Sequence, residues 1–135
     1  MEDLRTRWSH LTAMEGPRWP IRCGHVFSAD DLALLRDGLW PRDTDDRWAV
    51  WVDGGDTLRC WRSSTGTCIY EAQLLFVTDG SAAVGVLNVL DEENVYRRAP
   101  TDEGELERFE GVLSLVWRRE AGSNALEDIT TIQEP

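Results

Sequence analysis

The sequence lacks features that mark several large classes of protein. It contains no lysine, so all 14 basic side chains are arginine, and 25 acidic residues give a formal net charge of −11. A protein that binds nucleic acid in general needs a basic surface that displaces counterions. We therefore expect no general nucleic-acid binding. The acidity fits either solubility alone or a basic protein partner.

Long apolar runs are also absent. No run of about 18 apolar residues occurs, so we expect no transmembrane helix and no membrane partner. The N-terminal residues include acids and no apolar core segment, so we expect no secretory signal. These absences predict a cytoplasmic protein. The length predicts a single domain over 1–120, followed by a tail over 121–135 that is either docked or disordered.

The cysteines and histidines form no recognised motif. Cys23, Cys60 and Cys68 are an odd number without C-x-x-C spacing, which argues against a disulfide framework and favours buried thiols. With His25 they match no known zinc spacing, and a Cys–His hydrolase has equally little support. Nucleotide-binding glycine motifs are also missing. We predict no metal and no cofactor, and the sequence leaves open whether the protein is an enzyme.

Apolar spacing predicts three helices. One covers 3–15, and a second covers Ala29–Asp37 behind the N-cap residue Ser28. A third begins after Thr101, which is a suitable N-cap, and is expected to stop at Gly122.

Alternating apolar residues predict strands over 48–52, 57–62 and 67–77, and a nearly continuous apolar run predicts a fourth strand over 82–90. Glycine-containing turns separate the four strands. Residues 18–27 are expected to be extended chain. The order of elements predicts an α+β domain with two layers, in which the N- and C-terminal helices cover one face of an antiparallel four-stranded meander.

The other face of this sheet is a candidate binding surface. It is expected to carry Arg59, Trp61, Glu71 and Gln73, a mixture of polar and aromatic side chains. If Trp51 and Trp61 pair across the first hairpin, they would form a stacking platform for a base or a partner's side chain. The alternative is ordinary packing between the two strands.

The loop over 62–66 is the main candidate for ligand binding. Its hydroxyls, its backbone N–H groups and an arginine could hold a phosphate or a carboxylate. The predicted binding residues are Arg62, Ser63, Thr65 and Gly66, with Trp61 stacking and Asp46 and Arg47 beside them. The alternative is an ordinary β-turn. Asp46 could act as an acid or base, orient Arg62, or form a surface ion pair.

Two segments resemble a family of small bacterial proteins. The family pattern is an acidic pair, a basic residue and Trp, followed after a strand and a turn by Arg-Ser-Trp-Thr-Gly-x-Cys-Ile-Tyr. The matching residues here are 45–48 and 62–70, within a likeness that covers about 25–77. Members lie next to, or are fused with, macro domains that handle ADP-ribose. The pattern has Trp where this chain has Ser64, which puts a stacking role at that position in doubt.

Two functional hypotheses follow. The first is a recognition domain, similar to an immunity or regulatory protein, that binds a basic protein partner through an acidic surface bearing tryptophan. The second, which the resemblance implies, is a domain that binds or processes an ADP-ribose-like or nucleotide-like ligand through the loop over 62–66.

Overall fold

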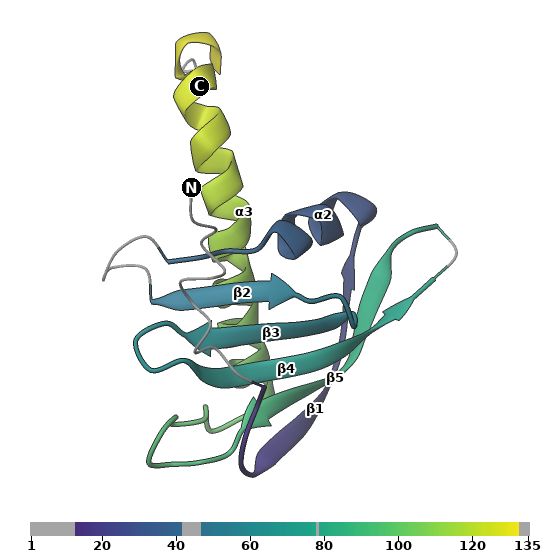
Figure 1. Cartoon of the computed structure of the whole chain (residues 1–135), viewed down its shortest axis with the longest axis vertical. Helices are drawn as coiled ribbons and strands as arrows, with labels where there is room; N and C mark the ends of the chain where they lie inside the picture. Colours follow the sequence, from purple (N-terminus) through teal and green to yellow (C-terminus); the bar gives the residue numbers. More distant parts are fainter. Residues whose placement is uncertain (1–12, 42–46, 78, 133–135) are drawn as a thin grey trace.

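The computed structural model describes residues 13–41, 47–77 and 79–132, with side chains described as far as Arg118. A five-stranded antiparallel sheet in the order β1-β5-β4-β3-β2 forms one layer (Figure 1). Its strands are β1 (Arg18–Phe27), β2 (Trp48–Val52), β3 (Thr57–Arg62), β4 (Thr67–Phe76) and β5 (Ala82–Leu90). The predicted α+β class with an antiparallel sheet is confirmed.

The prediction of four strands is wrong, because the segment expected to be extended chain forms the fifth strand. β1 pairs with β5 from Arg18 opposite Leu90 to Phe27 opposite Ala82. Pro20 argues against a central strand, but β1 lies at the edge of the sheet, where a missing N–H is tolerated. The register also shifts between Arg22 and His25. This irregularity disturbs the simple alternation by which a strand is found in a sequence.

Helix α2 (Ala29–Asp37) forms as predicted, and local hydrogen bonds fix its start. The backbone N–H of Asp31 donates to Ser28 Oγ, and the backbone N–H of Ser28 donates to the Asp31 carboxylate, both at 3.0 Å. This reciprocal pair is a capping box. The helix ends at Gly38, whose φ of 89° favours glycine. A Cβ atom at Gly38 would also lie only 2.5 Å from Trp40 Nε1.

Helix α3 (Asp102–Ile132) crosses one face of the sheet and continues past β2 (Figure 1). The hydroxyl of Thr101 accepts the backbone N–H of Gly104 at 3.0 Å, as expected for an N-cap. The predicted stop at Gly122 is wrong, because the helix continues through it. A glycine costs a helix only about 1 kcal/mol relative to alanine and does not end it alone. The expected tail is therefore helical as far as Ile132, and whether it docks stays a prediction.

Residues 3–12 of the predicted N-terminal helix lie outside the described residues. Its last three residues, 13–15, are described and are not helical. None of the helices in the described ranges is long and apolar enough to span a membrane.

The core lies between α3 and the sheet. Phe109 and Leu113 of α3 are buried, and the ring centroid of Phe109 lies 5.3 Å from that of Tyr70 on β4. Phe27 on β1 is buried on the same face, with its ring centroid 6.4 Å from that of Trp117. Side chains one position along each strand point to the opposite face. We call that opposite side the open face, because α3 does not cover it.

Candidate functional site

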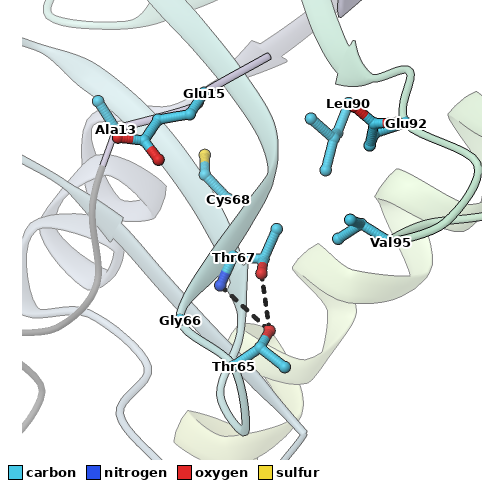
Figure 2. A pocket seen from close by; sticks show the side chains of 9 residues that line it. All are labelled: Ala13, Glu15, Thr65, Gly66, Thr67, Cys68, Leu90, Glu92 and Val95. Atoms are coloured by element: carbon cyan, nitrogen blue, oxygen red, sulfur yellow. Dashed lines mark hydrogen bonds between the residues drawn. The ribbon is translucent and has the colours of Figure 1, made fainter. Parts of the chain in front are cut away.

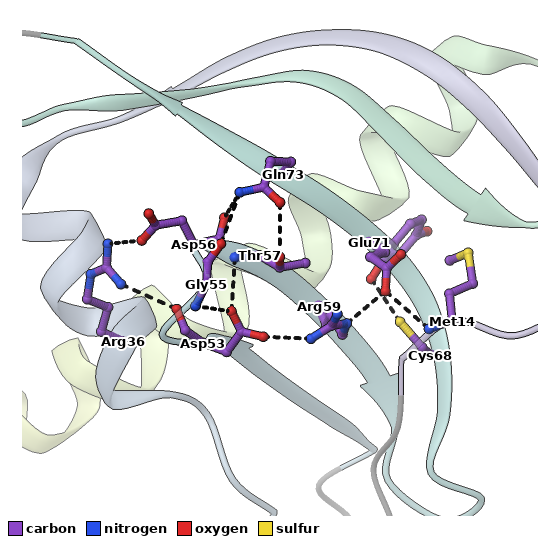
Figure 3. Close-up of polar contacts among 11 residues, drawn as sticks. Met14, Arg36, Asp53, Gly55, Asp56, Thr57, Arg59, Cys68, Glu71 and Gln73 are labelled. Carbon is purple, nitrogen blue, oxygen red and sulfur yellow. Dashed lines mark hydrogen bonds and ion pairs between the residues drawn. The ribbon is translucent and has the colours of Figure 1, made fainter.

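Ion pairs occupy the polar part of the open face, and we call them the open-face ion cluster (Figure 3). Arg59 lies between two carboxylates, with its Nη1 2.8 Å from Asp53 Oδ2 and its Nε 2.7 Å from Glu71 Oε2. Arg18 from β1 reaches the other oxygen of Glu71 at 3.1 Å. The backbone N–H of Met14 also donates to Glu71, at 3.1 Å. Arg59 and Glu71, which the sequence places on a binding surface, are thus engaged with each other.

The electrostatics of this cluster keep its carboxylates ionised. Burial alone would raise the pKa of Glu71, but the hydrogen bonds from Arg59 and Met14 and the charges of Arg59 and Arg18 outweigh it and hold the pKa below its ordinary value. Burial is likewise outweighed at Asp53, where hydrogen bonds from Thr57, Arg59 and Gly55 lower the pKa. Carboxylates with lowered pKa values are poor proton donors at neutral pH, so the cluster suits structure better than acid–base chemistry.

The two tryptophans expected to form a stacking platform are not direct partners across the hairpin. Trp61 lies opposite Ala49, and Trp51 lies opposite Arg59. Trp61 is only 3 % exposed, so stacking on a ligand would require this side chain to be uncovered. The ring centroid of Trp51 lies 5.6 Å from that of Trp40.

The turn after β3 lines a cavity of about 330 Å³ (Figure 2). The Thr65 and Thr67 hydroxyls lie 2.8 Å apart, and the Gly66 N–H donates to the carbonyl of Arg62, four residues back, at 2.8 Å, which closes an α-turn and not a β-turn. The carboxylates of Glu15 and Glu92 also line this cavity. Their negative charge opposes a phosphate at this place.

The remaining predicted residues are only partly brought together. Ser63 is nearly buried and donates its backbone N–H to the Arg47 carbonyl at 2.9 Å, which joins β3 to the start of β2. Asp46 lies outside the described residues. Arg62 is not among the residues that line the cavity at Thr65. Its guanidinium carbon lies 4.8 Å from the centroid of the Trp48 ring instead.

A buried carboxylate in the first turn of α3 is a second polar centre, and sequence reasoning missed it. Glu105 is fully buried and accepts hydrogen bonds from the hydroxyls of Tyr70 and Tyr96, each at 2.5 Å, and from the backbone N–H of Ala99 at 2.6 Å. Arg108 Nη1 lies 3.9 Å from Glu105 and donates to the Tyr96 hydroxyl at 2.6 Å. We call these five residues the buried carboxylate cluster.

The two tyrosines act as neutral donors in this cluster. Burial and the hydrogen bond to Glu105 raise the pKa of Tyr70 far above its ordinary value, and the same two causes raise the pKa of Tyr96. The only signal in the sequence was that Glu105 lies four residues before Phe109, on the apolar side of the helix. Its tyrosine partners are distant in sequence, so no local pattern points to them.

The cysteines show no activation. Burial raises the pKa of Cys60 well above its ordinary value, and it raises that of Cys68 to about 12. Burial also raises the pKa of Cys23, which is half-buried. Thiols of this kind stay protonated and are poor nucleophiles. Within the described ranges, no three His, Cys, Asp or Glu side chains lie close enough together to hold a metal.

Comparisons of the chain with protein-family models, curated proteins and solved structures give no match.

Proposed function

We propose that this protein is a recognition domain that binds a basic protein partner through the apolar part of its open face. The observation that carries the proposal is a set of exposed aliphatic side chains on β1, β4 and β5. We call Val26, Leu75, Ala83 and Val86 the open-face apolar patch. This surface differs from the predicted one, because it is aliphatic and because Trp61 is buried.

The strand register places the patch residues side by side. Ala83 on β5 lies opposite Val26 on β1 and opposite Leu75 on β4, so the three form one row across the sheet. A Cβ atom at Gly85 would lie 3.1 Å from Leu75 Cδ1, so the leucine side chain lies against this glycine. Val86 comes next to Gly85 on β5.

These side chains are unusually open for apolar residues. Val26 is 61 % exposed, Leu75 is 56 % exposed and Val86 is 47 % exposed. Single exposed apolar residues are common, but contiguous ones mark sites of protein interaction. A partner that covers these side chains removes apolar surface from water, which favours association.

The net charge of the chain and two acids at one end of the patch favour a basic partner, and one exposed arginine, Arg22, lies opposite Val86. The turn between β4 and β5 carries Asp79, and it lies against the start of α2, where Asp30 is exposed. Together with the net charge of −11, these carboxylates attract a basic surface to the end of the sheet where the patch lies. A patch with an apolar centre and a charged rim is typical of transient protein interfaces.

A site-specific crosslinking experiment tests this proposal. A photo-crosslinking amino acid at position 75 should capture a basic protein from host-cell extract, and the same probe at the exposed α3 position 107 serves as the control. With the captured protein purified, Leu75→Asp should weaken binding at least tenfold, since it places a charge in the apolar contact. Binding should also weaken as salt rises.

Three outcomes would overturn the proposal. The probes at 75 and 107 could capture the same proteins, the captured protein could be acidic, or position 75 could crosslink only to a second copy of this chain. The last result would assign the patch to self-association.

The alternative prediction, an ADP-ribose-like or nucleotide-like ligand at the loop over 62–66, is not favoured by the geometry. Glu15 and Glu92 line the cavity there, and Arg62 lies elsewhere.

A further inference from the structure

Arg62 is held between aromatic rings on the side of the sheet that faces α3. Its guanidinium carbon lies 4.8 Å from the ring centroid of Trp48, the residue opposite it on β2, and 6.0 Å from that of Tyr96. Rings pack against the flat faces of a guanidinium, whereas its five N–H groups lie in its plane. These contacts hold the guanidinium beside both rings, and any hydrogen bond must be made by the N–H groups at its edge.

One group of that edge, the Nε–H, lacks a hydrogen-bond partner within the part of the chain that the structure describes. Arg62 Nε is buried and makes no hydrogen bond there, and it is the only buried side-chain nitrogen or oxygen in that part with no partner. No described carboxylate forms an ion pair with Arg62. Buried polar groups are nearly always paired, and an orphaned one calls for a bound ion or water. A charged donor is especially costly to leave unpaired.

A second arginine adds positive charge at the same ring. The guanidinium carbon of Arg108 lies 5.4 Å from the centroid of Tyr96. Its Nη1 already donates to the Tyr96 hydroxyl and to the Arg97 carbonyl, which fixes its position. The nearby carboxylate of Glu105 is satisfied by three other donors, and it lies 3.9 Å from Arg108. Two arginines thus meet at one ring beside a single carboxylate.

We propose that Arg62 is the anchor of a binding site for a small oxyanion, a phosphate or carboxylate group, with Arg108 raising the local positive potential. A planar guanidinium with a free edge matches the two oxygens of such a group. The site is separate from the open-face apolar patch, because Arg62 lies over Trp48 and Tyr96 on the α3 side. It is also separate from the acidic cavity at Thr65.

The proposal is tested with inorganic phosphate and with acetate, each against sodium chloride at matched ionic strength. The Arg62 Nε–Hε signal of the whole protein is followed by NMR during each titration. We expect this signal to shift saturably with phosphate, acetate or both, and the arm that saturates identifies the oxyanion. No shift in either arm, or an equal shift with chloride, would show that Arg62 only packs against the rings.

A thermal-unfolding series gives an independent readout. At about ten times the dissociation constant, the oxyanion should raise the Tm of the wild-type protein by about 5 °C. Arg62→Met, which keeps a stem able to pack on Trp48, should lose this rise. Arg22→Met removes an exposed arginine of β1 and should keep it. A rise that persists in Arg62→Met, or that disappears in both variants, would overturn the proposal.

Discussion

Tyr70 and Glu71 are neighbours on β4, yet they belong to polar clusters on opposite faces of the sheet. Tyr70 joins the buried carboxylate cluster under α3, where one charge is held by two hydroxyls and a backbone N–H. Glu71 joins the open-face ion cluster, where charges are held by opposite charges at 2.7 Å and 3.1 Å.

The difference shows how burial decides which kind of partner stabilises a charge. In the interior, an unpaired charge is very costly, so removal of any partner of Glu105 leaves a group that water cannot reach. On the open face, water screens the charges and can replace a lost partner. The two clusters use similar distances, but we expect them to differ several-fold in their contributions to stability.

The largest expected effect is that of removing the buried carboxylate. Glu105→Ala leaves the hydroxyls of Tyr70 and Tyr96 without their acceptor and opens a cavity, so it should lower the free energy of unfolding by about 3–5 kcal/mol. Urea denaturation followed by tryptophan fluorescence measures this change. Glu107→Ala, an exposed acid on the same helix, is the control and should change stability by less than about 0.5 kcal/mol. Equal losses in the two variants would show that Glu105 contributes no more to stability than an exposed acid on the same helix.

Removal of one donor should have the next largest effect. Tyr70→Phe keeps the ring that packs on Phe109 and removes only the hydroxyl, so it should cost about 1–3 kcal/mol. A double-mutant cycle with Glu105→Gln measures how much of this cost belongs to the pair. Additive losses in the two variants would contradict a direct interaction between them.

The alkaline limb of the stability profile should report the same cluster. The folded protein holds the pKa of Tyr70 above its ordinary value of 10.0, so the unfolded state releases its proton first as pH rises. The stability from this residue is therefore complete below pH 10 and is lost as the pH rises toward the folded pKa. Wild-type protein should lose stability above about pH 10, and Tyr70→Phe should lose less of it. Parallel profiles from pH 8 to 11.5 would refute this assignment.

The elements whose formation depends on residues close together in the chain can be predicted from the sequence. Alternation of apolar residues predicts β2, β3 and β4, a nearly continuous apolar run predicts β5, and the N-cap residue Ser28 predicts the start of α2. All of these depend on residues a few positions apart. β1 was predicted only as extended chain because Pro20 argues against a strand and the register shift after Arg22 breaks the alternation of apolar residues. An edge strand tolerates both features.

The candidate sites depend on contacts between distant residues. Arg62 was predicted as a binding residue, but its position over Tyr96 depends on how the segment before α3 returns to the sheet. Glu105 is one of three acidic residues in the first turn of α3, and only the docking of this helix on the sheet brings it to Tyr70. Pairings of this kind leave no periodic signal in the sequence, whereas a cap or a strand does.

The smallest expected effect comes from the open-face ion cluster. Glu71→Gln removes a charge that Arg59 and Arg18 share, on a side chain that is 15 % exposed, and it should cost about 1 kcal/mol at low salt and less in 1 M NaCl. Because the folded protein lowers the pKa of Glu71, its stabilising effect is present above the ordinary carboxyl pKa and is lost as pH falls through the lowered one. Urea midpoints from pH 7 to 2 should therefore fall less steeply for Glu71→Gln than for wild type. A loss as large and as insensitive to salt as that of Glu105→Ala would mean that water does not screen the open face, and the contrast between the two clusters would fail.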